Sequence, residues 1–138
     1  MASKQAYNSM TDILLSLGSN LEPEAEARRV LESACAELSA LLTEAVASSL
    51  YATPAEGLHA HGTYVNCVMR ARTAFDEAAL ETAFKQMEAR YGRTPADKLT
   101  GRVPLDVDLV QWGERIVRPK NWQMNFMRRG LEELGTKN

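Results

Sequence analysis

The chain has 138 residues, 45% hydrophobic and 25% charged, a balance typical of one compact domain, so we expect a single domain over residues 1–138 with residues 1–10 as a flexible N-terminal segment. The formal net charge of -2 does not favour DNA or RNA as a partner. Because residues 1–10 lack the basic start and apolar run of a signal peptide, and no later stretch reaches membrane-spanning length, we expect a cytoplasmic protein with no membrane partner.

The first half of the chain combines short apolar runs with one long helical pattern. Residues 13–17 are apolar and stop at the turn-forming residues 18–20, which predicts a strand followed by a tight turn. From Glu22 onward apolar residues recur at helical spacing, which predicts an amphipathic helix packed on a sheet. Residues 44–51 predict a second extended segment, and Pro54 ends regular structure because the residue before a proline avoids the helical region.

The second half predicts the same kinds of element. Alternating apolar and polar residues predict a half-exposed strand over 64–73, and helical spacing predicts a helix from Asp76 to Gly92. Glycine, proline and charged residues favour a loop over 93–104. The remaining predicted elements are a strand over 105–112, a short edge strand at 116–117 and a terminal helix over 122–134.

The order strand, helix, strand, strand, helix, strand is that of the split βαβ arrangement. We therefore expect an α+β, ferredoxin-like fold (βαββαβ), in which an antiparallel sheet has helices on one face. Within the second predicted helix, Glu81 and Lys85 lie at i and i+4 and are expected to pair.

Two carboxylates share one face of the strand predicted over 105–112. The period of two directs Asp106 and Asp108 to one side and the apolar residues beside them to the other, with the aspartates about 6.6 to 7 Å apart along the strand. Two negative charges this close repel each other, and a bound hard cation removes the repulsion. Mg²⁺ is such a cation, and it prefers carboxylate, phosphate and water oxygens as ligands. The alternative is a solvated polar strand face, and the local sequence alone leaves both readings open.

Basic residues crowd the helix end and loop that lead into this strand. They are Arg90, Arg93, Lys98 and Arg102. Cations beside a metal-binding pair are what a polyphosphate requires, although basic loop residues taken alone are usually just solvated. The combination predicts a phosphoryl- or pyrophosphoryl-transferring enzyme. The chain contains neither the P-loop nor the dinucleotide-binding glycine motif.

An aromatic and an amide side chain share a face of the strand predicted over 64–73. Tyr64 and Asn66 lie two residues apart, and Thr53 with Pro54 precedes the hairpin that leads to them. A ring for stacking and an amide with paired donor and acceptor suit a planar heterocycle. The alternative is an ordinary pair of residues on a sheet surface.

Neither the histidines nor the cysteines form a recognisable metal motif. His59 and His61 have no third ligand near them in the sequence and are interpreted as surface residues. Cys35 and Cys67 each lie in an apolar-periodic segment and are interpreted as reduced core residues.

Five short motifs carry a family resemblance. In chain order they are Gly18-Ser19-Asn20-Leu21, Tyr51-x-Thr53-Pro54, Tyr64-x-Asn66, Glu88 to Arg93, and Leu105-Asp106-Val107-Asp108. This collinear set, which spans most of the chain, resembles the 6-hydroxymethyl-7,8-dihydropterin pyrophosphokinases of folate synthesis. The resemblance implies a ferredoxin-like fold and an enzyme that moves the terminal diphosphate of ATP onto the pterin hydroxymethyl group and releases AMP.

The resemblance also implies a role for each matching residue, with ATP and the pterin as small-molecule partners. Asp106 and Asp108 match aspartates that bind two Mg²⁺ ions. The residues that match the pterin pocket are Thr53, Pro54, Tyr64, Asn66 and Phe126. The residues assigned to ATP are Glu88, Arg93, Lys98, Arg102 and Lys120, of which Arg93, Lys98 and Arg102 are the expected catalytic cations.

The part of the chain assigned to ATP departs from the family pattern. Thr100 occupies the place of a family Trp, Arg102 lies one position early, and Lys120 stands where a His is usual. These departures keep two alternatives open. One is a pterin-binding or regulatory homologue that has lost turnover, and the other is a plain interaction module on the same fold. No feature of the sequence indicates an oligomeric state.

Overall fold

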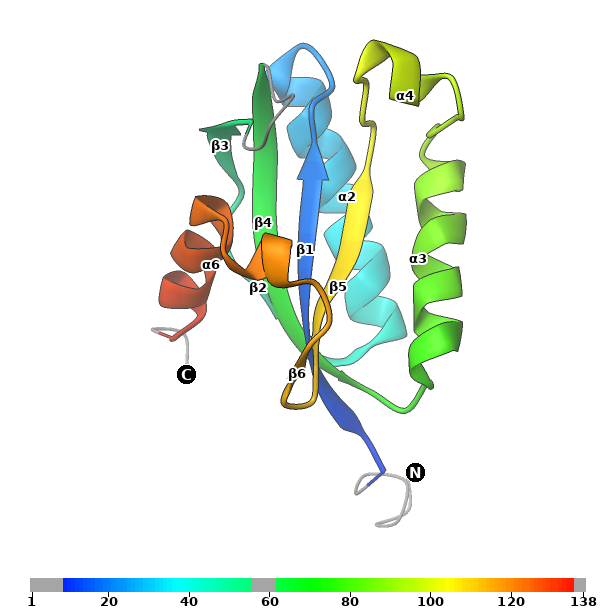
Figure 1. Ribbon diagram of the computed structural model, residues 1–138, viewed down its shortest axis with the longest axis vertical. Helices are drawn as coiled ribbons and strands as arrows, with labels where there is room; N and C mark the ends of the chain where they lie inside the picture. Colours follow the sequence, from blue (N-terminus) through cyan, green and yellow to red (C-terminus); the bar gives the residue numbers. More distant parts are fainter. Residues whose placement is uncertain (1–8, 56–61, 136–138) are drawn as a thin grey trace.

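A six-stranded antiparallel sheet forms the centre of the protein, as the computed structural model in Figure 1 shows. The structure describes residues 9–55 and 62–135. The sheet order is β2-β4-β1-β5-β6, and β3 also pairs with β4. The strands are β1 (Thr11–Ser19), β2 (Thr43–Ala47), β3 (Tyr51–Pro54), β4 (Thr63–Thr73), β5 (Asp106–Trp112) and β6 (Arg115–Ile116). The helices are α2 (Glu24–Leu41), α3 (Glu77–Arg90), α4 (Asp97–Thr100), α5 (Pro119–Trp122) and α6 (Asn125–Gly135).

The two long helices, α2 and α3, cover one face of the sheet (Figure 1). At the start of α3 the Asp76 side chain accepts a hydrogen bond from the Ala79 amide, whereas α2 begins after Pro23 without a side-chain cap. The main core lies between these helices and the inward residues of the sheet, among them Leu15, Cys67 and Leu109. Since β1 lies between β4 and β5, the predicted ferredoxin-like fold is confirmed.

The last helix, α6, packs on the opposite face of the sheet, in front of it in Figure 1. Its Met127 and Leu134 form a second small core with Val68 and Val110 of the sheet. A Cβ atom at Gly130 would lie 2.6 Å from Val68 Cβ, so the glycine permits this close approach. Because α6 covers only part of this face, the rest is left for the site described below.

Three predicted elements differ in detail. The extended segment over 44–51 forms two strands, β2 and β3. Between them Ser48 donates its amide to the Val68 carbonyl at 2.8 Å, and its hydroxyl, in place of its carbonyl, accepts from the Val68 amide at 2.9 Å. The loop over 93–104 contains α4, and the terminal helix over 122–134 is divided into α5 and α6.

The predictions for the two cysteines and for membrane spans can also be compared with the structure. Cys35 and Cys67 are free thiols with Sγ atoms 3.6 Å apart, and both pack in or against the main core. Among the described residues no helix combines the length and the apolar character needed to cross a bilayer. The predictions for residues 1–8, His59 and His61 lie outside the described residues.

Candidate functional site

A cavity of about 490 Å³ lies on the α6 side of the sheet, where β1 and β3 end and β4 and β5 begin. It brings together ten of the site residues predicted from the sequence. They are Thr53, Pro54, Tyr64, Asn66, Arg93, Lys98, Arg102, Asp106, Asp108 and Phe126. The other two, Glu88 and Lys120, do not line it. Residues that are far apart in the sequence therefore meet in one space.

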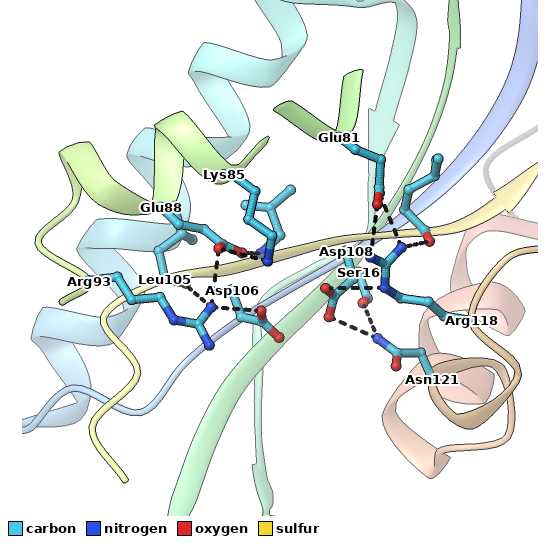
Figure 2. A network of polar contacts seen from close by, with 12 residues as sticks. Ser16, Glu81, Lys85, Glu88, Arg93, Leu105, Asp106, Asp108, Arg118 and Asn121 are labelled. Atoms are coloured by element: carbon cyan, nitrogen blue, oxygen red, sulfur yellow. Dashed lines mark hydrogen bonds and ion pairs between the residues drawn. The ribbon is translucent and has the colours of Figure 1, made fainter. Parts of the chain in front are cut away.

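The two aspartates face this cavity from the start of β5. In the pairing with β1, Asp106 lies opposite Gly18 and Asp108 opposite Ser16. Figure 2 shows both carboxylates on the side of β5 away from α3, as the strand period predicts. The Asp106 side chain is 38% exposed and that of Asp108 is 18% exposed, so Asp108 is the more enclosed of the pair.

Burial and the neighbouring carboxylate raise the pKa of Asp108 to about 7, even though Asn121 and Arg118 oppose the shift. Burial is the larger cause, because it disfavours the charged form of the carboxyl, and the negative charge of Asp106 nearby disfavours that form further. A divalent cation relieves this repulsion, and two hard carboxylate oxygens beside a cavity are the donor set that Mg²⁺ accepts. The residues present therefore fit a magnesium ion.

Glu88 supports this pair from the other side of the strand. It extends from α3 and is almost fully buried, and its Oε2 accepts a hydrogen bond from the Val107 amide at 2.9 Å. Burial raises the pKa of Glu88, while the Val107 amide opposes the shift. Although carboxyl oxygens of Glu88, Asp106 and Asp108 lie within 4.8 Å of one another, Glu88 reaches the strand from the α3 side (Figure 2). Its contacts indicate a positioning residue.

Arg93 connects these carboxylates. Its Nη1 lies 3.2 Å from Glu88 Oε1 and donates to Asp106 Oδ1 at 3.1 Å. Burial is the largest single contribution and lowers the pKa of Arg93. The charge and the hydrogen bond of Asp106, together with the charge of Glu88, outweigh burial, so the pKa of Arg93 is raised. The guanidinium is therefore a fixed cation at the cavity edge.

The loop that carries Lys98 and Arg102 is held by two polar side chains. Asp97 accepts hydrogen bonds from the Thr94 amide at 2.7 Å and from Arg102 Nη1 at 3.3 Å, and the Thr94 amide is the main reason that the pKa of Asp97 is lowered. Asn20 donates to the Gly101 carbonyl at 2.7 Å and accepts from the Val103 amide at 2.6 Å. The loop is thereby fixed to the end of β1.

The opposite wall of the cavity combines an amide with aromatic rings. Asn66 is buried and donates to Thr53 Oγ1 at 2.6 Å, which links β3 to β4. A Cβ atom at Gly18 would lie 3.0 Å from Asn66 Oδ1, so the glycine leaves room for this amide. Tyr64 and Phe126 also line the cavity, and burial raises the pKa of Tyr64. This wall therefore combines two aromatic side chains with a buried amide.

Sequence reasoning missed two residues that contact Asp108. Asn121 of α5 donates to Asp108 Oδ2 at 3.0 Å and to Ser16 Oγ at 3.3 Å. Arg118 Nε lies 3.6 Å from Asp108 Oδ1. Both belong to the segment after β6, which has no periodic pattern to orient it, so no local signal in the sequence marks them. The predicted Lys120 lies on the same segment and is exposed.

The fold and the site define a class of protein, a small α+β domain whose carboxylate pair and basic loop face one cavity. A family model described as 7,8-dihydro-6-hydroxymethylpterin-pyrophosphokinase (HPPK) matches residues 14–136. The chain therefore belongs to this family of ATP-dependent pyrophosphokinases of folate biosynthesis, which use ATP and Mg²⁺. The resemblance predicted from the five motifs is confirmed.

No curated protein matches the chain. Among solved structures, the chain is similar to the crystal structure of the Bacillus subtilis YXEP protein, a dinuclear metal-binding peptidase of the M20 family, with 13% identity and a TM-score of 0.29 over 78% of this chain. It spans 26% of that structure, and a likeness this low carries no argument about this protein.

Proposed function

We propose that this protein transfers the diphosphate of ATP to the hydroxymethyl group of 6-hydroxymethyl-7,8-dihydropterin, giving AMP and the pterin diphosphate. One observation carries the proposal: a single cavity is lined both by groups suited to a metal-bound polyphosphate and by a wall suited to a flat heterocycle. Membership of the pyrophosphokinase family supports the same reaction.

The polyphosphate side consists of the carboxylate pair and the basic residues around it. Asp106 and Asp108 hold the divalent cation, which when bound neutralises charge on the transferring diphosphate. Both contacts of Arg93 to carboxylates use Nη1, so Nη2 can donate to a phosphate oxygen. Lys98 and Arg102 add positive charge from the loop. Transfer of this kind depends on positioning and charge stabilisation, which these side chains provide.

The heterocycle side orients the acceptor. Because Asn66 Nδ2 is occupied by Thr53, its Oδ1 is directed to accept a hydrogen bond from a ring N–H group. Tyr64 and Phe126 enclose the ring, and Pro54 completes the pocket at the end of β3. The hydroxymethyl group then faces the carboxylate pair.

Formation of AMP tests the proposal. Purified protein with ATP, Mg²⁺ and the pterin alcohol should release AMP, and omission of Mg²⁺ or pterin should abolish this release. Asp106→Asn should lower turnover by about 10² to 10³-fold, the usual effect of losing one group that stabilises developing charge. Asp12→Asn is a matched control, because Asp12 is an exposed β1 carboxylate paired with Arg72. Absence of AMP in the complete reaction would refute the proposal.

The second candidate is a pterin-binding homologue without turnover. Two of the cations assigned to ATP are less available to it, and this favours the second candidate. Arg102 is bound to Asp97, and Lys120 does not line the cavity. Calorimetry separates the two candidates. Pterin binding without any nucleotide affinity would support the binding protein, whereas Mg²⁺-dependent binding of ATP that is lost in Asp106→Asn would support the enzyme.

A further inference from the structure

The two cysteines of the chain form a close pair that the proposed function does not use. Cys35 lies on α2 and Cys67 on β4, and their Sγ atoms are 3.6 Å apart. The pair lies on the face of the sheet that α2 and α3 cover, away from α6 (Figure 1). Cys67 is fully buried, whereas Cys35 is partly exposed. A solute can therefore reach one sulfur of the pair but not the other.

The position of the two thiols allows a bond between them. The sulfur atoms of a disulfide are about 2.05 Å apart, so the pair has to close by about 1.5 Å. β4 holds Cys67 in place, because this strand pairs with β1 on one side and with β2 and β3 on the other. α2 contacts the sheet through side-chain packing, so rotation of the two cysteine side chains and a small shift of α2 can supply the movement.

The hydrogen bond between the thiols gives them different chemical roles. With Cys67 as the donor, this bond lowers the pKa of the Cys35 thiol, although burial and the nearby charge of Glu32 oppose the shift. The contact with Cys35, together with burial, raises the pKa of the Cys67 thiol. Because the thiolate is the reactive form, Cys35 is the attacking sulfur and Cys67 keeps its proton.

We propose that Cys35 is an oxidation site for peroxides, and that the product is a reversible disulfide with Cys67 that fastens α2 to β4. The Cys35 thiolate attacks one oxygen of hydrogen peroxide and the O–O bond breaks. Cys35 becomes a sulfenic acid, and the departing hydroxide takes up the proton that the thiol has lost, which gives water.

The second step uses the buried thiol. The Cys67 sulfur attacks the Cys35 sulfur, the S–S bond forms as the S–O bond breaks, and the departing hydroxide leaves with the Cys67 proton as a second water. The two thiols together lose two electrons, and the peroxide gains them. Cys67 thus captures the sulfenic acid before it can be oxidised to the irreversible sulfinic acid.

The bridge should also make the protein harder to unfold. The segment between the two cysteines contains β2 and β3, and a cross-link that closes such a segment restricts the unfolded chain. The midpoint of urea denaturation should therefore rise on oxidation and return to its first value with dithiothreitol.

Thiol mapping of the full chain tests the proposal without nucleotide or pterin. The reduced protein is treated with hydrogen peroxide for increasing times, unfolded in the presence of an alkylating reagent, and analysed by peptide mass spectrometry. We expect the free thiols of Cys35 and Cys67 to disappear at the same rate into one intramolecular disulfide. Dithiothreitol should restore both.

Two variants separate the roles of the thiols. In Cys67→Ser the sulfenic acid of Cys35 has no partner, so dimedone, a reagent for sulfenic acids, should label Cys35. Cys35→Ser is the matched control, because the buried Cys67 should keep its thiol under the same treatment.

Several outcomes in the wild type would overturn the proposal. They are two unchanged thiols, loss of Cys35 alone as a sulfinic acid, a disulfide between two copies of the chain, or a urea midpoint that falls on oxidation. These measurements need no variant, so they do not depend on the folding of Cys35→Ser or Cys67→Ser. None of them bears on the proposed diphosphate transfer, which AMP formation tests separately.

Discussion

The carboxylate of Glu88 accepts a hydrogen bond at 2.9 Å from the backbone amide of Val107, the residue between the two aspartates. On that side of β5, strand β6 pairs only with Gln111 and Trp112, so Glu88 takes the place of a neighbouring strand. A satisfied amide keeps the strand extended at this point, and an extended strand is what directs Asp106 and Asp108 to the same face. A side chain outside the cavity thus determines its geometry.

Glu88→Ala should lower the free energy of unfolding by about 1–3 kcal/mol, because the buried Val107 amide loses its acceptor. Glu88→Gln should cost less, since the amide oxygen can still accept. Urea denaturation measures both. Glu37→Ala is the control: its pair with Arg90 lies on the surface and is worth about 0–1 kcal/mol. An equal cost for Glu88→Ala and Glu37→Ala would show that Glu88 does not support the strand.

Gly130→Ala should destabilise the protein by about 1–3 kcal/mol, because the added methyl group would lie 2.6 Å from Val68 Cβ and 2.8 Å from the Tyr51 hydroxyl. The higher helix propensity of alanine offsets only about 1 kcal/mol of the strain. The shift of α6 should also displace Phe126 and weaken pterin binding. Thermal denaturation and calorimetry measure the two effects.

Gly135→Ala is the matched control for this change, since a Cβ atom there meets no atom within 4 Å. It should alter stability by no more than about 0.5 kcal/mol. If Gly130→Ala were as stable as wild type, α6 would not be held as closely to the sheet as the structure indicates.

The fold could be predicted because its main signals are local. The alternation over β4 and the helical spacing of α2 each follow from the period of one element, and the structure has both where they were expected. The division of residues 44–51 could not be predicted, because it depends on a hydrogen bond between Ser48 and the Val68 amide, which are far apart in the sequence. Local patterns carry no information about such a contact.

In the site, too, local patterns in the sequence predict some features, and contacts between distant residues determine the others. The strand period was enough to place Asp106 and Asp108 on one face. The expected pair of Glu81 with Lys85 is wrong: Glu81 binds Arg118, and Lys85 Nζ lies 3.7 Å from Glu88. A helical spacing rule considers only partners on the same helix, whereas Arg118 arrives from a segment positioned by β5 and α3. The residues around Asp108 therefore needed the structure.

Asn20→Ala should loosen the loop that carries Lys98 and Arg102. The two side-chain hydrogen bonds of Asn20, to Gly101 and Val103, are each worth about 0.5–1.5 kcal/mol. If both are lost, the KM for ATP should therefore rise by about 5- to 150-fold, while pterin affinity changes little. Faster hydrogen exchange at the Val103 amide would report the loosening directly. An unchanged exchange rate together with an unchanged KM would contradict the role of Asn20.

The raised pKa of Asp108, about 7, predicts how the stability of the metal-free protein depends on pH. An unfolded aspartate has a pKa of about 3.9, so between about pH 4 and 7 the folded protein holds a proton that the unfolded chain releases. The stabilising contribution of the Asp108 proton to the free energy of unfolding is therefore fully present below about pH 4, and it is lost as pH rises through about 7. Unfolding measured across this range should show a steeper fall in the wild type than in Asp108→Asn. Parallel pH profiles would refute the shift.

The same proton predicts the pH dependence of Mg²⁺ binding. A carboxylate must be ionised to bind a hard cation, so Mg²⁺ competes with the proton on Asp108. Below pH 7 binding should release a proton and weaken as pH falls, whereas well above pH 7 it should release none. Calorimetry in two buffers of different ionisation enthalpy measures the protons released. Asp108→Asn should bind Mg²⁺ more weakly and without this proton release, because Asp106 remains as the carboxylate of the pair. Release of a proton at pH 8.5, or none at pH 6, would contradict the assignment of the shifted pKa to Asp108.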